Sequence, residues 1–144
     1  MTAEPEPPRW LSRLDTFRRA VDNLAMAVEQ FRQRPFSVIE KAGLVQLYEV
    51  AWELGWKVQA DYLRSMGHQI QLVGPRPVIR AAFEAGLIEN GQGWVDATKL
   101  RNELSHIYDA ARADAALEVI AESYLPLMMA LVSKLDDADT HSAL

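Results

Sequence analysis

The spacing of apolar residues near the start of the chain is the feature that most restricts its fold. Large apolar side chains recur there at alternating intervals of three and four residues: Leu14, Phe17, Val21, Leu24, Val28 and Phe31. This interval places them on one narrow stripe of an α-helix, the kind of seam that helical bundles bury. We therefore predict a helix with Ser12 as its N-cap that runs to about Arg34, where Pro35 ends it.

The next segment predicts a second helix, from about Ser37 to Met66, with Gly67 as the residue that ends it. Its main apolar stripe consists of Leu44, Tyr48, Ala51, Gly55, Val58 and Tyr62, and a second face consists of Val45, Trp52, Trp56 and Leu63. Two apolar faces indicate a central helix that is contacted from more than one side. Gly55 costs up to about 1 kcal/mol of helix propensity, so we expect another backbone to approach closely there.

Three further helices follow from the same patterns. A short helix opens at Pro75 or Pro77, because proline is well suited to the first helical turn. Another runs from about Trp94 into a polar segment, and the last covers roughly residues 113–135. Pro126 should kink this last helix, since proline lacks the amide hydrogen that the helix needs.

The expected fold class is all-α, because no alternating strand pattern occurs anywhere in the chain. We predict an antiparallel bundle of four to five helices over residues 10–135. Residues 1–9 are expected to form a flexible tail, and residues 136–144 an acidic flexible tail.

Composition excludes several functional classes. The 144 residues include no cysteine and three histidines, so disulfides and thiolate or zinc centres are not expected, and we predict no metal and no cofactor. The net charge of −5 argues against broad coating of nucleic acid. We see no apolar run of membrane-spanning length, about 20 residues. The chain is expected to be soluble and cytoplasmic, with no membrane association.

Charged residues are distributed unevenly along the chain. The first helical segment is rich in arginine, whereas the C-terminal segment is rich in aspartate and glutamate. The arginines are Arg9, Arg13, Arg18, Arg19, Arg32 and Arg34, and the acidic residues are Asp109, Asp114, Glu118, Glu122, Asp136, Asp137 and Asp139. Such runs are usually solvated helix faces. The alternative is a basic arm that helps to hold RNA or an acidic partner.

The segment 101–108 carries side chains that a helical bundle does not need for packing: Arg101, Asn102, Ser105, His106 and Tyr108. Metal-independent RNA cleavage can use this set. The histidine would act as general acid or base near neutral pH, and the arginine would bind the phosphate and stabilise charge in the transition state. Asn102 and Ser105 would orient the imidazole or the phosphate, and Tyr108 would stack on a base, donate to phosphate or be modified. Attack by a ribose 2′-hydroxyl would restrict the substrate to RNA.

Helix geometry separates the two principal residues of this segment. Arg101 and His106 are about 140° apart on a regular helix, and His106 faces away from the apolar stripe. They converge on one phosphate only if the helix loosens near Ser105 or if a second subunit contributes its own copy. In a purely structural interpretation, Arg101 pairs with Glu103 or an aspartate and Tyr108 is an aromatic at the edge of the bundle.

Residues 101–108 resemble the R-x-x-x-x-H-x-Y signature of HepT-like HEPN proteins, which include the family labelled nucleotidyltransferase substrate-binding proteins. Residues 47–54, LYEVAWEL, are similar to the aromatic-Glu-x-Ala-Trp segment of the family's second helix. Residues 75–88, PRPVIRAAFEAGLI, are similar to its proline-started short helix. Trp94 before the signature and Asp109 after it also fit. The resemblance extends over nearly the whole predicted bundle.

The resemblance implies a HEPN-type bundle that forms a homodimer and acts as the RNase toxin of a toxin–antitoxin pair. The antitoxin would be a minimal nucleotidyltransferase encoded beside it. The resemblance further implies an active cleft at the dimer interface, with Arg101 and His106 as catalytic residues and Asn102 as their polar neighbour. It implies that the partner can silence the RNase by adenylylating Tyr108, because the added phosphate brings negative charge next to the arginine.

The alternative function is that of a non-catalytic substrate-binding or accessory subunit of a minimal nucleotidyltransferase. The chain has no glycine-rich phosphate loop and no paired-aspartate motif, so the catalyst of any nucleotide transfer would be another protein. Glu49 and Glu53 would then form either a solvated edge or the surface on which that partner docks. Trp52 and Trp56 are expected in the core or at a dimer interface rather than as base-stacking platforms.

Overall fold

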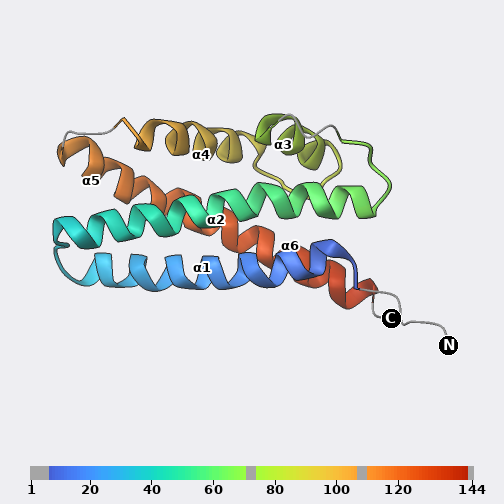
Figure 1. Ribbon diagram of the computed structural model, residues 1–144, viewed down its shortest axis with the longest axis horizontal. Helices are drawn as coiled ribbons and strands as arrows, with labels where there is room; N and C mark the ends of the chain where they lie inside the picture. The colour runs from blue at the N-terminus through green and yellow to red at the C-terminus, as the bar shows by residue number, and fades with distance from the viewer. Residues whose placement is uncertain (1–6, 71–73, 107–109, 143–144) are drawn as a thin grey trace.

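The computed structural model describes residues 7–70, 74–106 and 110–142, and all regular structure in these ranges is helical (Figure 1). The helices are α1 (Arg9–Gln33), α2 (Val38–Ser65), α3 (Pro75–Glu84), α4 (Gly91–Leu104), α5 (Ala110–Val119) and α6 (Leu125–Ser142), with a π-helical turn, η1 (Ile120–Tyr124), between the last two. The elements α5, η1 and α6 follow one another directly and form a single long helix. The expected all-α bundle is confirmed.

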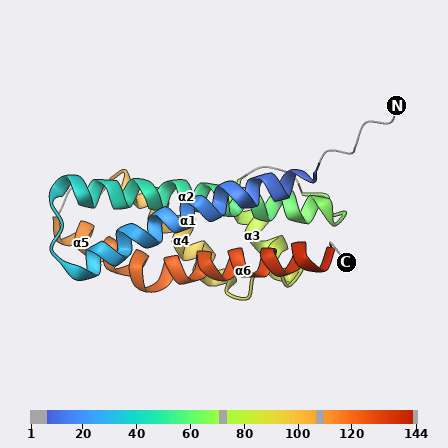
Figure 2. The same ribbon diagram turned by 90° about the horizontal axis from the view of Figure 1, so that it is seen from below.

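Helix α2 is the central element of the bundle. It runs antiparallel to α1 on one side and has α3 and α4 on the other, while the long helix of α5 and α6 crosses both α1 and α2 (Figures 1 and 2). Leu44, Tyr48 and Val58 of α2 are fully buried. The prediction of a helix contacted from more than one side is therefore confirmed.

Both ends of α2 lie where the sequence predicted them, and local hydrogen bonds set them. The Ser37 hydroxyl accepts from the Glu40 amide at 3.1 Å, and the Glu40 carboxylate accepts from the Ser37 amide at 3.0 Å. Such a reciprocal pair satisfies backbone donors that a helix start leaves free. At the other end, Gly67 has a φ of 91° and the His68 amide donates back to the Leu63 carbonyl at 3.0 Å.

The start of α1 differs from the prediction. The helix begins at Arg9 after Pro8, and Ser12 lies within it rather than capping it. The Ser12 carbonyl accepts a hydrogen bond from the Thr16 hydroxyl at 3.2 Å. The physical reason is tertiary: Trp10 is buried and packs edge-on against Tyr62, with ring centroids 5.0 Å apart. Packing of this aromatic pair draws an extra turn of helix onto the bundle.

The C-terminal helix also extends beyond its predicted end. Residues 136–142, which we expected to form a flexible tail, continue α6 to Ser142. Leu135 is fully buried, and Asp136 forms an ion pair with Arg18 of α1. This contact between the two chain ends holds the acidic segment in helical form, a tertiary effect that local composition does not reveal.

The disturbance expected at Pro126 takes the form of the π-helical turn that precedes it. The Leu125 amide donates to the Ile120 carbonyl, one residue further back than in an α-helix. The Ala121 carbonyl thereby loses its usual donor, and the next candidate, Pro126, has no amide hydrogen. The Arg32 guanidinium of α1 donates to this carbonyl at 3.1 Å. An arginine from another helix thus satisfies the acceptor that the proline leaves free.

The long C-terminal helix, over Arg112–His141, is apolar enough by length and composition to cross a membrane, although we expected no such segment from the sequence. One side of it is buried in the bundle, through Leu117, Ile120, Met128, Leu131 and Leu135. Core helices of bundles pass the same test of length and composition, so this feature by itself assigns no membrane role.

The arginines of α1 are largely engaged within the bundle. Arg13 pairs with the buried Asp61 at 2.9 Å, and Arg18 and Arg19 pair with Asp136 and Asp15. Arg34, directly after α1, pairs with Glu40. Arg32 donates to a backbone carbonyl. The basic run is therefore mainly a set of internally paired helix faces, which leaves little free positive charge on α1 for RNA.

Gly55 makes room for side chains rather than for a second backbone, which corrects our expectation. A Cβ atom at this position would lie 2.7 Å from Cη2 of Trp94 and 3.1 Å from Cε1 of Phe17. Gly43, on an exposed part of the same helix, has nothing within 4 Å of that position. The two glycines therefore form a natural comparison within α2.

We expect Gly43→Ala and Gly55→Ala to shift stability in opposite directions. Gly43→Ala should raise the free energy of unfolding by about 0.5–1 kcal/mol, because alanine restricts the unfolded chain and favours helix. Gly55→Ala should lower it, because overpacking costs about 1–3 kcal/mol and outweighs that gain. Urea unfolding followed by circular dichroism measures both. Equal stabilisation by the two variants would contradict the tight Trp94 contact.

We also expect Glu40 to make a pH-dependent contribution to the free energy of unfolding. The Arg34 guanidinium, followed by the Ser37 amide, lowers the pKa of Glu40 from 4.5 to about 2. Because the folded pKa is the lower one, the stabilisation is complete above about pH 4.5 and disappears as the pH falls through 2. Glu40→Gln should be less stable than wild type at pH 7, with a difference that shrinks between pH 4.5 and 2. Glu118→Gln, at an exposed position on α5, is the matched control and should show no such trend.

Candidate functional site

The segment 101–106 forms the last turn of α4 and its exit. The helix ends at Leu104, and the His106 amide donates to the Glu103 carbonyl at 2.9 Å in a tighter turn. The Ser105 hydroxyl points back toward the Asn102 carbonyl at 3.4 Å. Tyr108, together with residues 107 and 109, lies outside the described residues. The regular helix therefore stops at Leu104, two residues before His106. Loosening of the helix near Ser105 was one of the two conditions for Arg101 and His106 to converge.

Buried polar contacts from α2 fix the position of α4. The Tyr48 hydroxyl donates to the Ala97 carbonyl at 2.6 Å, and the Trp52 indole N–H donates to the Thr98 hydroxyl at 3.2 Å. Thr98 in turn donates to the Trp94 carbonyl at 2.8 Å. Burial raises the pKa of Tyr48, so its hydroxyl remains a neutral donor. The prediction of a core position for Trp52 is confirmed.

Arg101 faces α2. Its Nε lies 3.7 Å from Oε2 of Glu49, and its guanidinium carbon lies 5.7 Å from the centroid of the Trp52 ring. A cation over an indole face is stabilised by about 0.5–2 kcal/mol. The acidic partner is thus Glu49 of α2, not Glu103 or an aspartate. Both side chains remain about one-third exposed, so the guanidinium is held in place but open to solvent.

His106 lies on a different side of α4. With Asn102 and Glu103 it lines an open groove of about 490 Å³ whose other wall is α5, including Arg112. Arg101 does not line this groove. Within one chain the structure therefore brings His106 together with Asn102, but not with Arg101.

Arg112 is the cation that sequence reasoning missed. It lies within the acid-rich C-terminal segment, so nothing in its local surroundings marked it as a site residue. The groove combines an exposed imidazole, a side-chain amide and a guanidinium, a set that can bind a phosphate and take part in proton transfer. Glu103 adds one opposing carboxylate.

The remaining candidates are placed as follows. Glu53 pairs with Lys57 at 3.0 Å and accepts from the half-buried Trp56 indole at 3.3 Å, so it belongs to a solvated helix edge. His68 is exposed after α2. His141 lies in α6, beside the Asp137 carbonyl, rather than in a tail. Over the described ranges, no group of three histidine, cysteine or acidic residues is arranged to hold a metal ion.

Residues 12–137 match the family described as nucleotidyltransferase substrate binding protein like. The match spans the whole bundle, and the chain therefore belongs to this family. The part of the sequence resemblance that concerned substrate-binding proteins of nucleotidyltransferases is thus confirmed. No curated protein matches the chain significantly.

Two solved structures are similar to the chain. A protein of Thermus thermophilus has 27% identity and a TM-score of 0.72, with 83% of this chain and 98% of that one covered. A protein of Haemophilus influenzae has 27% identity and a TM-score of 0.68, with 85% and 98% covered. The latter structure is described as revealing the fold of a substrate-binding domain of a nucleotidyltransferase.

We expect Thr98→Val to destabilise the contact that positions this site. The substitution leaves the buried Trp52 indole N–H without an acceptor, which costs about 1–3 kcal/mol of unfolding free energy. Thr16→Val is the matched control, because Thr16 is exposed on α1 and should change stability by no more than about 0.5 kcal/mol. Urea unfolding compares the two. Equal losses of unfolding free energy in the two variants would show that the hydrogen bond from Trp52 to Thr98 makes no specific contribution to stability.

Proposed function

We propose that this protein is the substrate-binding partner of a separate nucleotidyltransferase, with the end of α4 as its functional surface. The observation that carries the proposal is the family match over residues 12–137. The likeness to a structure described as a nucleotidyltransferase substrate-binding domain supports it. The sequence lacks motifs for nucleotidyl transfer of its own, so the catalytic groups would come from the partner.

The contacts of α4 support the choice of surface. Tyr48 and Trp52 hold this helix rigidly against α2 through buried hydrogen bonds. Asn102, His106 and Arg112 then face solvent from a fixed frame. A preorganised polar surface loses little entropy on binding, which favours recognition of a partner or substrate.

The second candidate function is a metal-independent RNase toxin that the nucleotidyltransferase neutralises. The observation that favours it is the exposed imidazole of His106 in a groove with Arg112 and Asn102. The general acid–base role falls to His106. Arg101 faces α2 in the same chain, so the proposal includes a homodimer in which the second copy supplies an arginine across the interface.

The adenylylation of Tyr108 belongs to the same proposal. The phenolic oxygen would attack the α-phosphorus of ATP bound to the partner, form the new O–P bond and release pyrophosphate, while a base on the partner takes the phenolic proton. The product carries a negative charge seven residues from Arg101 in sequence and two from His106. That charge would compete with an RNA phosphate for the cations of the site.

The test combines binding with cleavage. The purified chain and the nucleotidyltransferase encoded beside it should form a complex by size-exclusion chromatography and calorimetry. We expect His106→Ala and Arg112→Ala to weaken that complex at least about fivefold, the scale of an interface residue that matters. His68→Ala is the matched control and should bind like wild type. The absence of any complex with the wild-type chain would contradict the partner role.

A mixed RNA pool, incubated without divalent metal, separates the two candidates. The substrate-binding function predicts no cleavage by protein that intact mass shows to be unmodified. The RNase function predicts cleavage that leaves cyclic phosphate ends and that falls by at least about 100-fold in His106→Ala. Cleavage that survives in this variant would exclude His106 as the catalytic residue.

A further inference from the structure

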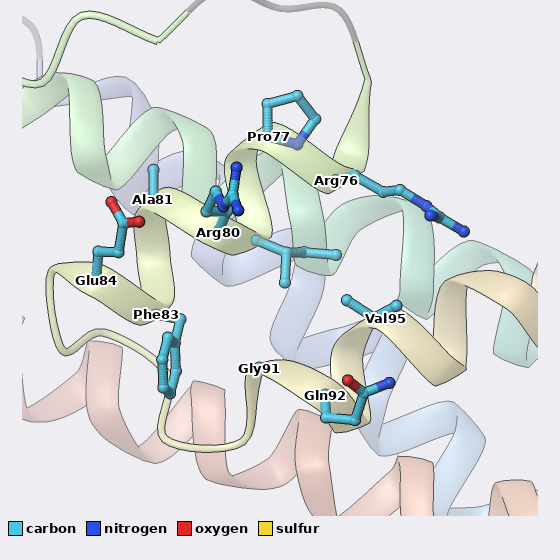
Figure 3. A pocket seen from close by; sticks show the side chains of 10 residues that line it. Arg76, Pro77, Arg80, Ala81, Phe83, Glu84, Gly91, Gln92 and Val95 are labelled. Atoms are coloured by element: carbon cyan, nitrogen blue, oxygen red, sulfur yellow. The ribbon is translucent and has the colours of Figure 1, made fainter.

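An open groove lies between α3 and α4, and neither candidate function uses it. It has a volume of about 780 Å³ and an apolar floor that includes Ile79, Ala81 and Val95. Figure 3 shows that Arg76, Arg80 and Phe83 of α3 surround it from one side, with Gln92 and Val95 of α4 on the other. Cationic and aromatic side chains over an apolar floor restrict the chemistry of the ligand that can bind there.

Phe83 is an aromatic side chain that is held in place yet open to solvent. It is 53% exposed, although a phenyl ring gains most from burial. Its ring lies against Gly91 at the start of α4, where an added Cβ would come within 3.2 Å of it. The glycine thus allows the ring to pack on one side and leaves the remainder free. A fixed, half-exposed ring provides a surface on which a flat group can stack.

Arg76 and Arg80 lie one helical turn apart on α3, and both are exposed. Among the described residues, neither lies within ion-pair distance of a carboxylate, although Glu84 also lines the groove. This distinguishes them from the arginines of α1, most of which are paired internally. On a chain with a net charge of −5, two unpaired guanidinium groups beside an exposed ring form a local binding site for an anion.

Beyond the α3–α4 groove, side chains on one face of α4 lead toward His106, which lines a separate groove. Gln92, Val95, Lys99 and Asn102 are spaced alternately by three and four residues, which aligns them on one side of α4. His106 follows two residues after the helix ends. Gln92 and Val95 line the α3–α4 groove, and Asn102 and His106 line the groove beside α5. Lys99, exposed, lies between them. From Val95 to Leu104, where the helix ends, α4 rises about 14 Å, so the path to His106 is too long for one nucleotide to span.

We propose that the α3–α4 groove binds single-stranded RNA, and that the strand runs along α4 to the groove of His106. A base stacks on Phe83 while Arg76 and Arg80 contact phosphates, the combination by which single strands are held without base pairing. The Gln92 amide nitrogen donates to Asp96 at 2.9 Å, which leaves its oxygen as an acceptor. This oxygen and the Asn102 amide hydrogen-bond ribose 2′-hydroxyls, which distinguish RNA from DNA. Only a polymer reaches both grooves, which excludes a mononucleotide as the occupant.

The inference rests on the RNase function only where it gives the strand's path to His106 a catalytic purpose. Binding of RNA in the groove requires no cleavage. Fluorescence anisotropy with a labelled single-stranded RNA of about 12 nucleotides, in His106→Ala protein, therefore tests it directly. We expect Phe83→Ser to weaken binding about 5- to 150-fold, the range for one stacked base. Phe83→Tyr, which keeps the ring, should restore most of the affinity.

Arg76→Ala/Arg80→Ala should flatten the salt dependence of binding. Each lost phosphate contact lowers the slope of log affinity against log salt by about 0.7 for a single strand, so the double variant should lose about 1.4. The matched controls are Met26→Ser, at an exposed apolar position of α1, and Arg19→Ala, at an exposed arginine of α1. Neither control should alter affinity by more than about twofold.

The outcomes separate this inference from the proposed function. Absence of RNA binding by a protein that still binds its nucleotidyltransferase would overturn the groove assignment and leave the partner role intact. Equal losses in the groove variants and the α1 controls would also overturn it, because binding would then follow total charge alone. Equal affinity for DNA of the same sequence would overturn the assignment of RNA. Groove-dependent RNA binding, together with no cleavage of RNA by the unmodified wild-type protein, would support the inference and exclude the RNase function.

Discussion

The hydrogen bond from the buried Trp52 indole to the Thr98 hydroxyl, together with that from Tyr48 to the Ala97 carbonyl, is the constraint on which the functional surface depends. Both bonds join α2, which is buried on two sides, to α4, which carries most of the candidate functional residues. A buried donor without a partner costs more than its hydrogen bond contributes. The two bonds therefore select one register of α4 on α2, and every position from Val95 to His106 follows from that register.

This register gives α4 two functional sides with different chemistry. Toward α2, Arg101 is held between Glu49 and the Trp52 ring, so its charge is partly neutralised within the chain. Toward α5 and α3, His106 and Gln92 line open grooves, and Lys99 is exposed between them. A reaction that needs Arg101 and His106 together requires a second subunit, whereas binding along the open side requires only one chain. The choice between the two candidate functions therefore depends on whether the protein forms a homodimer.

The arginines of the bundle differ in whether they are paired, according to the helix that carries them. The arginines of α1 pair with Asp15, Asp61, Asp136 and Glu40 or donate to the π-helical turn. Those pairs stabilise the contacts between helices and leave α1 with little net attraction for a polyanion. The two arginines of α3 have no such partners among the described residues, although no local pattern in the chain distinguishes them from the others. An acidic chain can in this way keep a small, local affinity for an anion without binding nucleic acid broadly.

Much of the fold was determined by the sequence itself. Apolar periodicity predicted the helices and the central position of α2, because burial of one or two helix faces needs that spacing whatever the neighbours are. Capping chemistry at Ser37 and Gly67 fixed the ends of α2, because those hydrogen bonds are local. The segments around Trp52 and Arg101 also carried enough signal to indicate the family that the match over residues 12–137 shows.

Tertiary structure alone decided the features that depend on contacts between distant residues. Trp10 against Tyr62 extended α1, and Arg18 with Asp136 kept the acidic end of α6 helical. The partner of Arg101 is Glu49, which lies on another helix far earlier in the chain, and helix periodicity contains no information about that pairing. The same holds for Arg112 beside His106 and for the free arginines of α3. A local pattern states which side of a helix is apolar, but only the packed bundle determines what lies opposite the polar side.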